Sequence, residues 1–156
     1  MRVRLIAVGS RMPKWVREAY EDYITRLGSG LKVTLVEIEP GPRSAGQPPQ
    51  KAMQAEGQKL LAALRKDDYV VALDERGSEM TTRELAGWLG SRMQDGRDLA
   101  FLVGGPDGFV PEVVARSDLK WSLSRLTFPH ALVRVVLAEQ LYRAHGVLAN
   151  HPYHRD

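Results

Sequence analysis

Residues 101–109 read FLVGGPDGF, an apolar run that ends in a turn with three glycines. The uncharged run at residues 99–103 is typical of a strand buried inside a parallel sheet. Gly104, Gly105 and Gly108 permit positive φ and let a ligand approach the backbone closely. Because ligands of open α/β sheets bind outside the carboxyl ends of the strands, the turn is either a ligand-binding wall or a plain strand-to-helix connection.

Strands and helices alternate on both sides of this turn. We expect strands at residues 3–8, 31–38, 69–73, 99–103 and around Trp121. We expect helices at about residues 13–27, 50–65, 81–93, 111–116 and 129–146. This order predicts an α/β fold, a mostly parallel sheet covered by helices, in one domain spanning residues 1–156. Residues 40–49 (PGPRSAGQPP) predict a mobile loop whose one charge is Arg43.

The last expected helix is apolar on nearly every side. Only a narrow polar stripe interrupts its apolar residues, which are Leu132, Val133, Val135, Val136, Leu137, Leu141 and Tyr142. A helix of this kind has to be covered on most sides. One of those sides is therefore a candidate contact with another subunit.

Composition narrows the possible classes of protein. The 156 residues include no cysteine, which excludes disulfides, iron–sulfur clusters, thiolate zinc sites and cysteine nucleophiles. No apolar run approaches the roughly 20 residues of a membrane helix, so we expect a soluble, cytoplasmic protein. The net charge is +3, and residues 1–66 hold 12 Lys and Arg against 6 Asp and Glu. Phosphate contact and a solvated surface explain this excess about equally well.

Other candidate residues lie near the carboxyl end of the chain. Ser122, Ser124 and Thr127 either bind a ligand or cap the backbone, and capping is the more frequent role. A structural role is also favoured for His130 at a helix start. The tail carries His151 and His154, but two histidines on a proline-bearing tail make a poor metal site, so no metal is expected.

Five motifs occur in an order and spacing that resemble the ribosomal RNA large subunit methyltransferase H family of the SPOUT class of knotted methyltransferases. They are LVGGPDG at 102–108, SLSRLTFPH at 122–130, LVRV at 132–135, AEQLYRA at 138–144 and NHPYHR at 150–155. The resemblance runs the length of the chain, including AVG at 7–9 and MP at 12–13.

This resemblance implies a C-terminal trefoil knot from about Tyr69 onward and a homodimer with the last helix in the interface. It implies transfer of a methyl group from S-adenosylmethionine to N3 of a pseudouridine in 23S ribosomal RNA within the assembled ribosome. Carried over by position, the cofactor contacts are Leu73, Gly104, Leu123, Ser124, Arg125, Leu126, Thr127 and Phe128. No role carries over to residues 40–49.

The expected chemistry needs a base, because N3 of pseudouridine is a poor nucleophile until its proton leaves. We predict that His154 is the base, that Arg155 stabilises the developing charge and that Tyr153 positions the ring. Glu139 and Arg143, four residues apart, are expected to form an intrahelical pair. Two other functions stay open, namely methylation of another RNA such as tRNA and a ribosome-binding module without catalysis.

Overall fold

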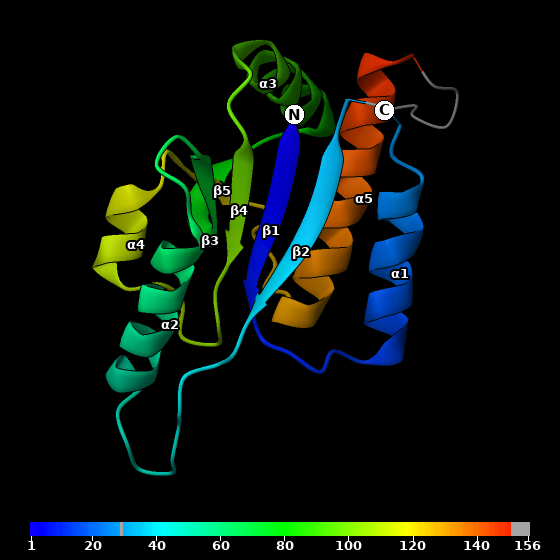
Figure 1. The fold of residues 1–156 in the computed structure, drawn as a ribbon. Helices are drawn as coiled ribbons and strands as arrows, with labels where there is room; N and C mark the ends of the chain where they lie inside the picture. The colour runs from blue at the N-terminus through cyan, green and yellow to red at the C-terminus, as the bar shows by residue number, and fades with distance from the viewer. Residues whose placement is uncertain (29, 151–156) are drawn as a thin grey trace.

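The computed structural model describes residues 1–28 and 30–150, and in them five parallel strands form one sheet in the order β2-β1-β4-β3-β5. Figure 1 shows the strands side by side with their carboxyl ends at the lower edge. The strands are β1 (Arg2–Val8), β2 (Lys32–Ile38), β3 (Tyr69–Glu79), β4 (Leu99–Val103) and β5 (Leu119–Ser122). The expected α/β class and parallel sheet are confirmed.

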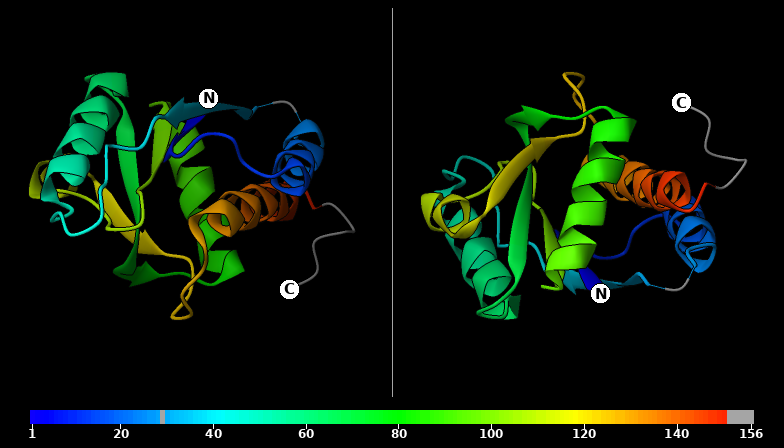
Figure 2. Two further views of the ribbon diagram at one scale, coloured as in Figure 1. Left: turned by 90° about the horizontal axis from the view of Figure 1, so that it is seen from below. Right: turned by 90° about the horizontal axis from the view of Figure 1, so that it is seen from above.

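Helices cover both faces of the sheet, as Figure 2 shows. They are α1 (Lys14–Thr25), α2 (Gln50–Ala63), α3 (Thr82–Asp95), α4 (Pro111–Arg116) and α5 (His130–Leu148). Helices α2 and α4 lie on one face, whereas α1, α3 and α5 lie on the other, with α5 packed against both α1 and α3. Each expected helix is present with its ends displaced by a few residues at most.

Strand β3 differs most from the expectation, because it extends to Glu79 instead of ending near Leu73. Its pairing with β5 shifts in register between Leu73 and Ser78. A Cβ atom at Gly77 would lie 2.5 Å from the carbonyl carbon of Lys120, so only glycine permits this close approach of the two strands. Polar residues after Leu73 thus continue the strand along β5, which the apolar pattern could not indicate.

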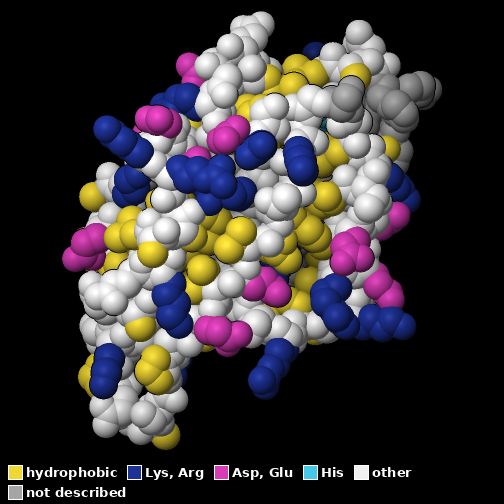
Figure 3. Space-filling model, in the orientation of Figure 1, with side chains coloured by type: hydrophobic (Ala, Val, Ile, Leu, Met, Phe, Trp, Pro, Cys, Tyr) yellow, Lys and Arg dark blue, Asp and Glu magenta, His cyan; other side chains and the backbone are white. Residues whose placement is uncertain are grey.

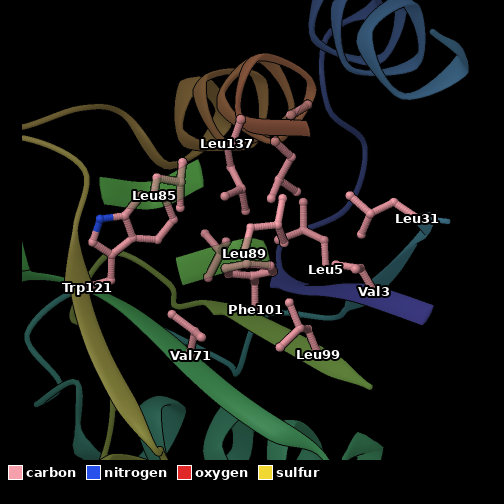
Figure 4. Packing of buried hydrophobic residues seen from close by; sticks show 14 of the residues in the cluster. Val3, Leu5, Leu31, Val71, Leu85, Leu89, Leu99, Phe101, Trp121 and Leu137 are labelled. Atoms are coloured by element: carbon pink, nitrogen blue, oxygen red, sulfur yellow. The ribbon is translucent and has the colours of Figure 1, made fainter. Parts of the chain in front are cut away.

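The larger core cluster lies between the sheet and helices α1, α3 and α5. Figure 4 shows Phe101 of β4 among side chains of this cluster, with Trp121 of β5 on one side and Leu5 of β1 on the other. Leu137 and Leu141 of α5 are each no more than 1% exposed. The sheet, α1 and α3 therefore cover much of the apolar surface that made α5 a candidate subunit contact.

Charged side chains gather at the amino edge of the sheet. Figure 3 shows lysine and arginine side chains over the upper ends of the strands in this view. Several are paired with carboxylates: Arg4 with Asp68, which is 2% exposed, and Arg116 with Asp118 at 3.5 Å. Of these two arginines, Arg4 belongs to the basic excess of residues 1–66, and its charge is used within the fold. None of the helices in the described part of the chain is long and apolar enough to cross a membrane.

Candidate functional site

The glycine-rich turn follows β4 at the carboxyl edge of the sheet. Gly105 and Gly108 pair as an antiparallel bridge in which the Gly108 N–H donates to the Gly105 carbonyl at 3.1 Å. Gly108 has a φ of +84°, the left-handed region that favours glycine. A Cβ atom at Gly104 would lie 3.1 Å from Cε1 of Phe109. The turn therefore depends on glycine at these positions.

A cavity of about 640 Å³ opens beside this turn. Its walls come from the middle of β3, from the carboxyl ends of β4 and β5, from the segment that follows β5 and from the start of α5. The volume lies within the range typical of small-molecule sites, about 300–1,000 Å³. The turn is thus both a tight connection and one wall of a cavity, so the two interpretations of its glycines are compatible.

Seven of the eight residues expected to contact a cofactor line this cavity, although they come from three separate parts of the chain. They are Leu73, Gly104, Leu123, Ser124, Leu126, Thr127 and Phe128. Arg125 is absent from the lining; its side chain is 90% exposed, with Nε 4.0 Å from Oε1 of Glu79.

Hydrogen bonds fix the conformation of the segment after β5. Ser122 Oγ donates to the Ser124 carbonyl at 2.8 Å, and the Leu126 N–H donates to Ser124 Oγ at 2.9 Å. The favoured backbone role of the two serines is confirmed. Thr127 instead donates from Oγ1 to Oε2 of Glu75 at 3.2 Å, which links this segment to β3 across the cavity.

His130 and Arg134 of α5 lie next to the end of β1. His130 lines the cavity, and a Cβ atom at Gly9 would lie 3.6 Å from its Nε2 atom. Arg134 is 1% exposed and donates to Oε2 of Glu37 at 2.7 Å and to the Gly9 carbonyl at 2.8 Å. This arginine anchors the first turns of α5 to β1 and β2.

Several lining residues were missed by the sequence analysis. Asp74, Glu75 and Asp107 place carboxylates around the cavity, and Phe109 and Trp121 add aromatic walls. Asp74 and Glu75 directly follow Leu73, so the rule that ligands bind at the carboxyl ends of strands could have indicated them. Nothing in the sequence pattern brings Met53 of α2 to the same cavity.

The predicted catalytic residues Tyr153, His154 and Arg155 lie outside the described residues, as does His151. The expected pair on α5 is confirmed, because Arg143 donates from Nε to Oε1 of Glu139 at 2.7 Å. Among residues 1–28 and 30–150, no group of three or more His, Asp or Glu side chains is arranged to hold a metal ion.

Comparison with known proteins matches the chain over nearly its whole length. A family model described as "Predicted SPOUT methyltransferase" matches residues 1–154. The chain is 57% identical over 159 aligned positions to ribosomal RNA large subunit methyltransferase H of Alkalilimnicola ehrlichii, with 99% of each chain covered. It is 54% identical over 155 positions to the protein of the same name from Stenotrophomonas maltophilia, again with 99% of each covered. For that of Thiobacillus denitrificans the identity is 50% over 156 positions and covers both chains fully.

Proposed function

Because the chain belongs to the ribosomal RNA large subunit methyltransferase H family of SPOUT methyltransferases, we propose that it methylates N3 of a pseudouridine in 23S ribosomal RNA within the assembled ribosome, with S-adenosylmethionine as methyl donor. One observation carries the proposal. Seven of the residues expected to hold the donor, distant in sequence, line a single cavity at the carboxyl edge of the sheet.

The residues around the cavity fit S-adenosylmethionine. Gly104 and Gly105 leave room along one wall, while Leu73, Phe109 and Leu123 offer apolar surface to an adenine ring. The carboxylates that line the cavity suit the positive charges on the sulfonium and amino groups of the donor. When bound, the donor supplies an activated methyl group, which requires no metal.

The remaining task of the protein is to prepare the acceptor. In this proposal His154 removes the proton from N3, Arg155 stabilises the charge that develops on the flanking carbonyl oxygens, and Tyr153 positions the ring. The chemistry of these side chains supports the assignment. Helix α5 begins at His130, which lines the cavity, and its 19 residues carry the chain about 28 Å away, so Asn150 lies far from the cavity of its own subunit. In this proposal the tail therefore serves the cavity of a second copy.

The proposal includes a homodimer with α5 in its interface. Among residues 1–28 and 30–150, three large apolar side chains are exposed: Leu126 at 71%, Trp15 at 56% and Leu148 at 43%. Leu148 ends α5, and Leu126 lies in the segment just before this helix. Contact with a second copy would remove such surface from water.

A C-terminal trefoil knot, a single domain over residues 1–156 and a cytoplasmic location complete the proposal. Family membership supports the knot. The route of the chain is compatible with it: after β5 the chain lines the cavity and then enters α5, which lies on the opposite face of the sheet from α4. The cytoplasmic location follows from the proposed ribosomal substrate.

Mass mapping of methylated nucleotides tests the function. Ribosomes from a strain that lacks the activity are incubated with the purified protein and S-adenosylmethionine. We expect a gain of one methyl group on one pseudouridine of 23S RNA, located on N3, and none on tRNA. Methylation of tRNA alone would support another RNA substrate on the same fold. Ribosome binding without any methyl transfer would support a binding module instead.

A further inference from the structure

Arg43 joins two carboxylates that belong to different parts of the chain. Its Nη1 and Nη2 atoms donate to Oε2 and Oε1 of Glu56 in α2 at 2.5 and 3.2 Å. Its Nε atom donates to Oδ2 of Asp107 in the glycine-rich turn at 3.0 Å. The loop at residues 40–49 was expected to be mobile, and no role carried over to it from the family. In the structure its one charged side chain is tied to the wall of the cavity.

Glu56 is the buried anchor of this arrangement, with 2% of its surface exposed. Besides Arg43, it accepts a hydrogen bond from the Gly41 N–H at 2.9 Å. A Cβ atom at Gly105 would lie 2.9 Å from Oε1 of Glu56, so the backbone of the turn lies against this carboxylate. A buried carboxylate needs a charged partner, and Arg43 provides it.

Close backbone contacts hold the same parts together on the α2 side. A Cβ atom at Gly41 would lie 2.3 Å from the carbonyl oxygen of Ala52, so the loop passes directly over the first turn of α2. A Cβ atom at Gly57 would lie 2.5 Å from Cγ2 of Val110, just after the turn. The loop, α2 and the turn thus form one packed unit.

The planar guanidinium of Arg43 suits this geometry. Two of its edges meet two carboxylates at once, which the single ammonium of lysine cannot reproduce. The hydrogen bond to Glu56 raises the pKa of Arg43, with further contributions from Asp107, although partial burial opposes the shift. Arginine stays protonated in proteins, and these contacts strengthen that preference.

We propose that Arg43 and Glu56 are positioning residues that hold the turn at residues 104–109 in the conformation that accepts S-adenosylmethionine. Neither side chain lines the cavity, whereas Asp107 does, so both act through Asp107 and the backbone of Gly105. The inference rests on the proposed function. It assigns residues 40–49 a part in donor binding that they perform from outside the cavity.

A double-mutant cycle with Arg43→Lys and Asp107→Asn tests the tether in the full-length protein. Lysine keeps a cation beside the buried Glu56 but cannot reach the second carboxylate as well. Asp107→Asn removes the charge of that carboxylate and so weakens the same contact between loop and turn. Calorimetry at 25 °C should show that Arg43→Lys weakens S-adenosylmethionine binding about tenfold, as expected for a lost hydrogen bond between charged groups. In the Asp107→Asn background the same change should weaken binding no more than about twofold.

Arg4→Lys is the matched control, because Arg4 pairs with the buried Asp68 at the opposite edge of the sheet. It should lower the melting temperature and leave donor affinity unchanged. In ribosome assays Arg43→Lys should raise KM for the donor with kcat within about twofold of wild type.

The possible outcomes separate this inference from the proposed function. Absence of donor binding by the wild type overturns both. Donor binding that is equal in wild type and Arg43→Lys overturns the tether alone. The tether is also overturned if the losses of donor affinity caused by Arg43→Lys and by Asp107→Asn multiply in the double variant, because the two side chains would then act independently.

Discussion

At the scale of single residues, Gly104 has the most direct link to the proposed donor site. A side chain there meets Phe109, whose ring also lines the cavity. We expect Gly104→Val to displace this ring into the cavity and to weaken S-adenosylmethionine binding at least tenfold, as measured by calorimetry. Gly87→Ala is the control, because a Cβ atom at this position in α3 meets nothing within 4 Å. Equal affinity in Gly104→Val and wild type would contradict the assignment of this wall.

Tyr20 predicts a specific pH dependence of stability. Burial raises the pKa of this tyrosine to about 12, an effect that the charge of Arg134 partly offsets. Above pH 10 the unfolded chain loses the phenolic proton while the folded protein keeps it. The contribution of Tyr20 to the free energy of unfolding is therefore fully present below about pH 10 and is lost as the pH rises through 12.

Tyr20→Phe removes this dependence. Among the described residues the buried Tyr20 hydroxyl has no hydrogen-bond partner, so the variant should be as stable as wild type at pH 8 or about 1 kcal/mol more stable. Between pH 9 and 11.5 its free energy of unfolding, measured with urea, should fall by about 2 kcal/mol less than that of wild type. Parallel pH curves for the two proteins would show that Tyr20 does not carry the effect.

At the scale of elements, α3 begins with a complete capping box. Thr81 Oγ1 accepts from the Glu84 N–H at 3.1 Å, and Oε2 of Glu84 accepts from the Thr81 N–H at 3.1 Å. We expect Thr81→Ala to lower the free energy of unfolding by about 1 kcal/mol, as measured by urea denaturation. Thr81→Ser keeps the hydroxyl and should retain most of the stability. Similar losses in both variants would mean that the threonine methyl group, and not the cap, stabilises the helix.

The same helix shows why many elements could be predicted from the sequence. A threonine at 81 or 82 followed by Glu84 is a local signal for its start, and the uncharged run at residues 99–103 is a local signal for β4. The extension of β3 beyond Leu73 depends on Gly77 meeting Lys120, a contact between residues distant in sequence. The tether of Arg43 was missed for the same reason.

The candidate site likewise contains some residues that the sequence could indicate and others that only the three-dimensional structure brings to it. Apart from Arg125, the residues proposed to contact the donor line one cavity, although their role there stays a prediction. Glu75 lies just after Leu73 and could have been indicated as a lining residue, but its hydrogen bond with Thr127 depends on how β3 and the segment after β5 meet in space. The tail residues stay a prediction.

At the scale of the whole molecule, we predict that the tail of one subunit serves the cavity of its partner. Removal of residues 151–156 should abolish methyl transfer, while donor binding and dimerisation persist, because the lost groups act on the acceptor. The sharper test mixes Gly104→Val subunits with tail-less subunits, each of which is inactive alone. If tails act across the interface, one site of the mixed dimer has both the Gly104→Val cavity and the missing tail. The other site then has a normal cavity and a normal tail, so activity should return. Background activity in confirmed mixed dimers would show that each tail serves its own cavity.

The pairing of β1 with β4 has a consequence for folding during synthesis on the ribosome. Val3 lies opposite Leu99, so 96 residues separate partners in the middle of the sheet. At about 5–20 residues per second, a ribosome needs roughly 5–20 s to synthesise that interval. Strand β1 can meet β2 early, but its other edge stays open during this time, and pairings between strands so distant in sequence favour slow folding. Until β4 is synthesised, this edge of β1 is therefore available for pairing with the strands of other chains.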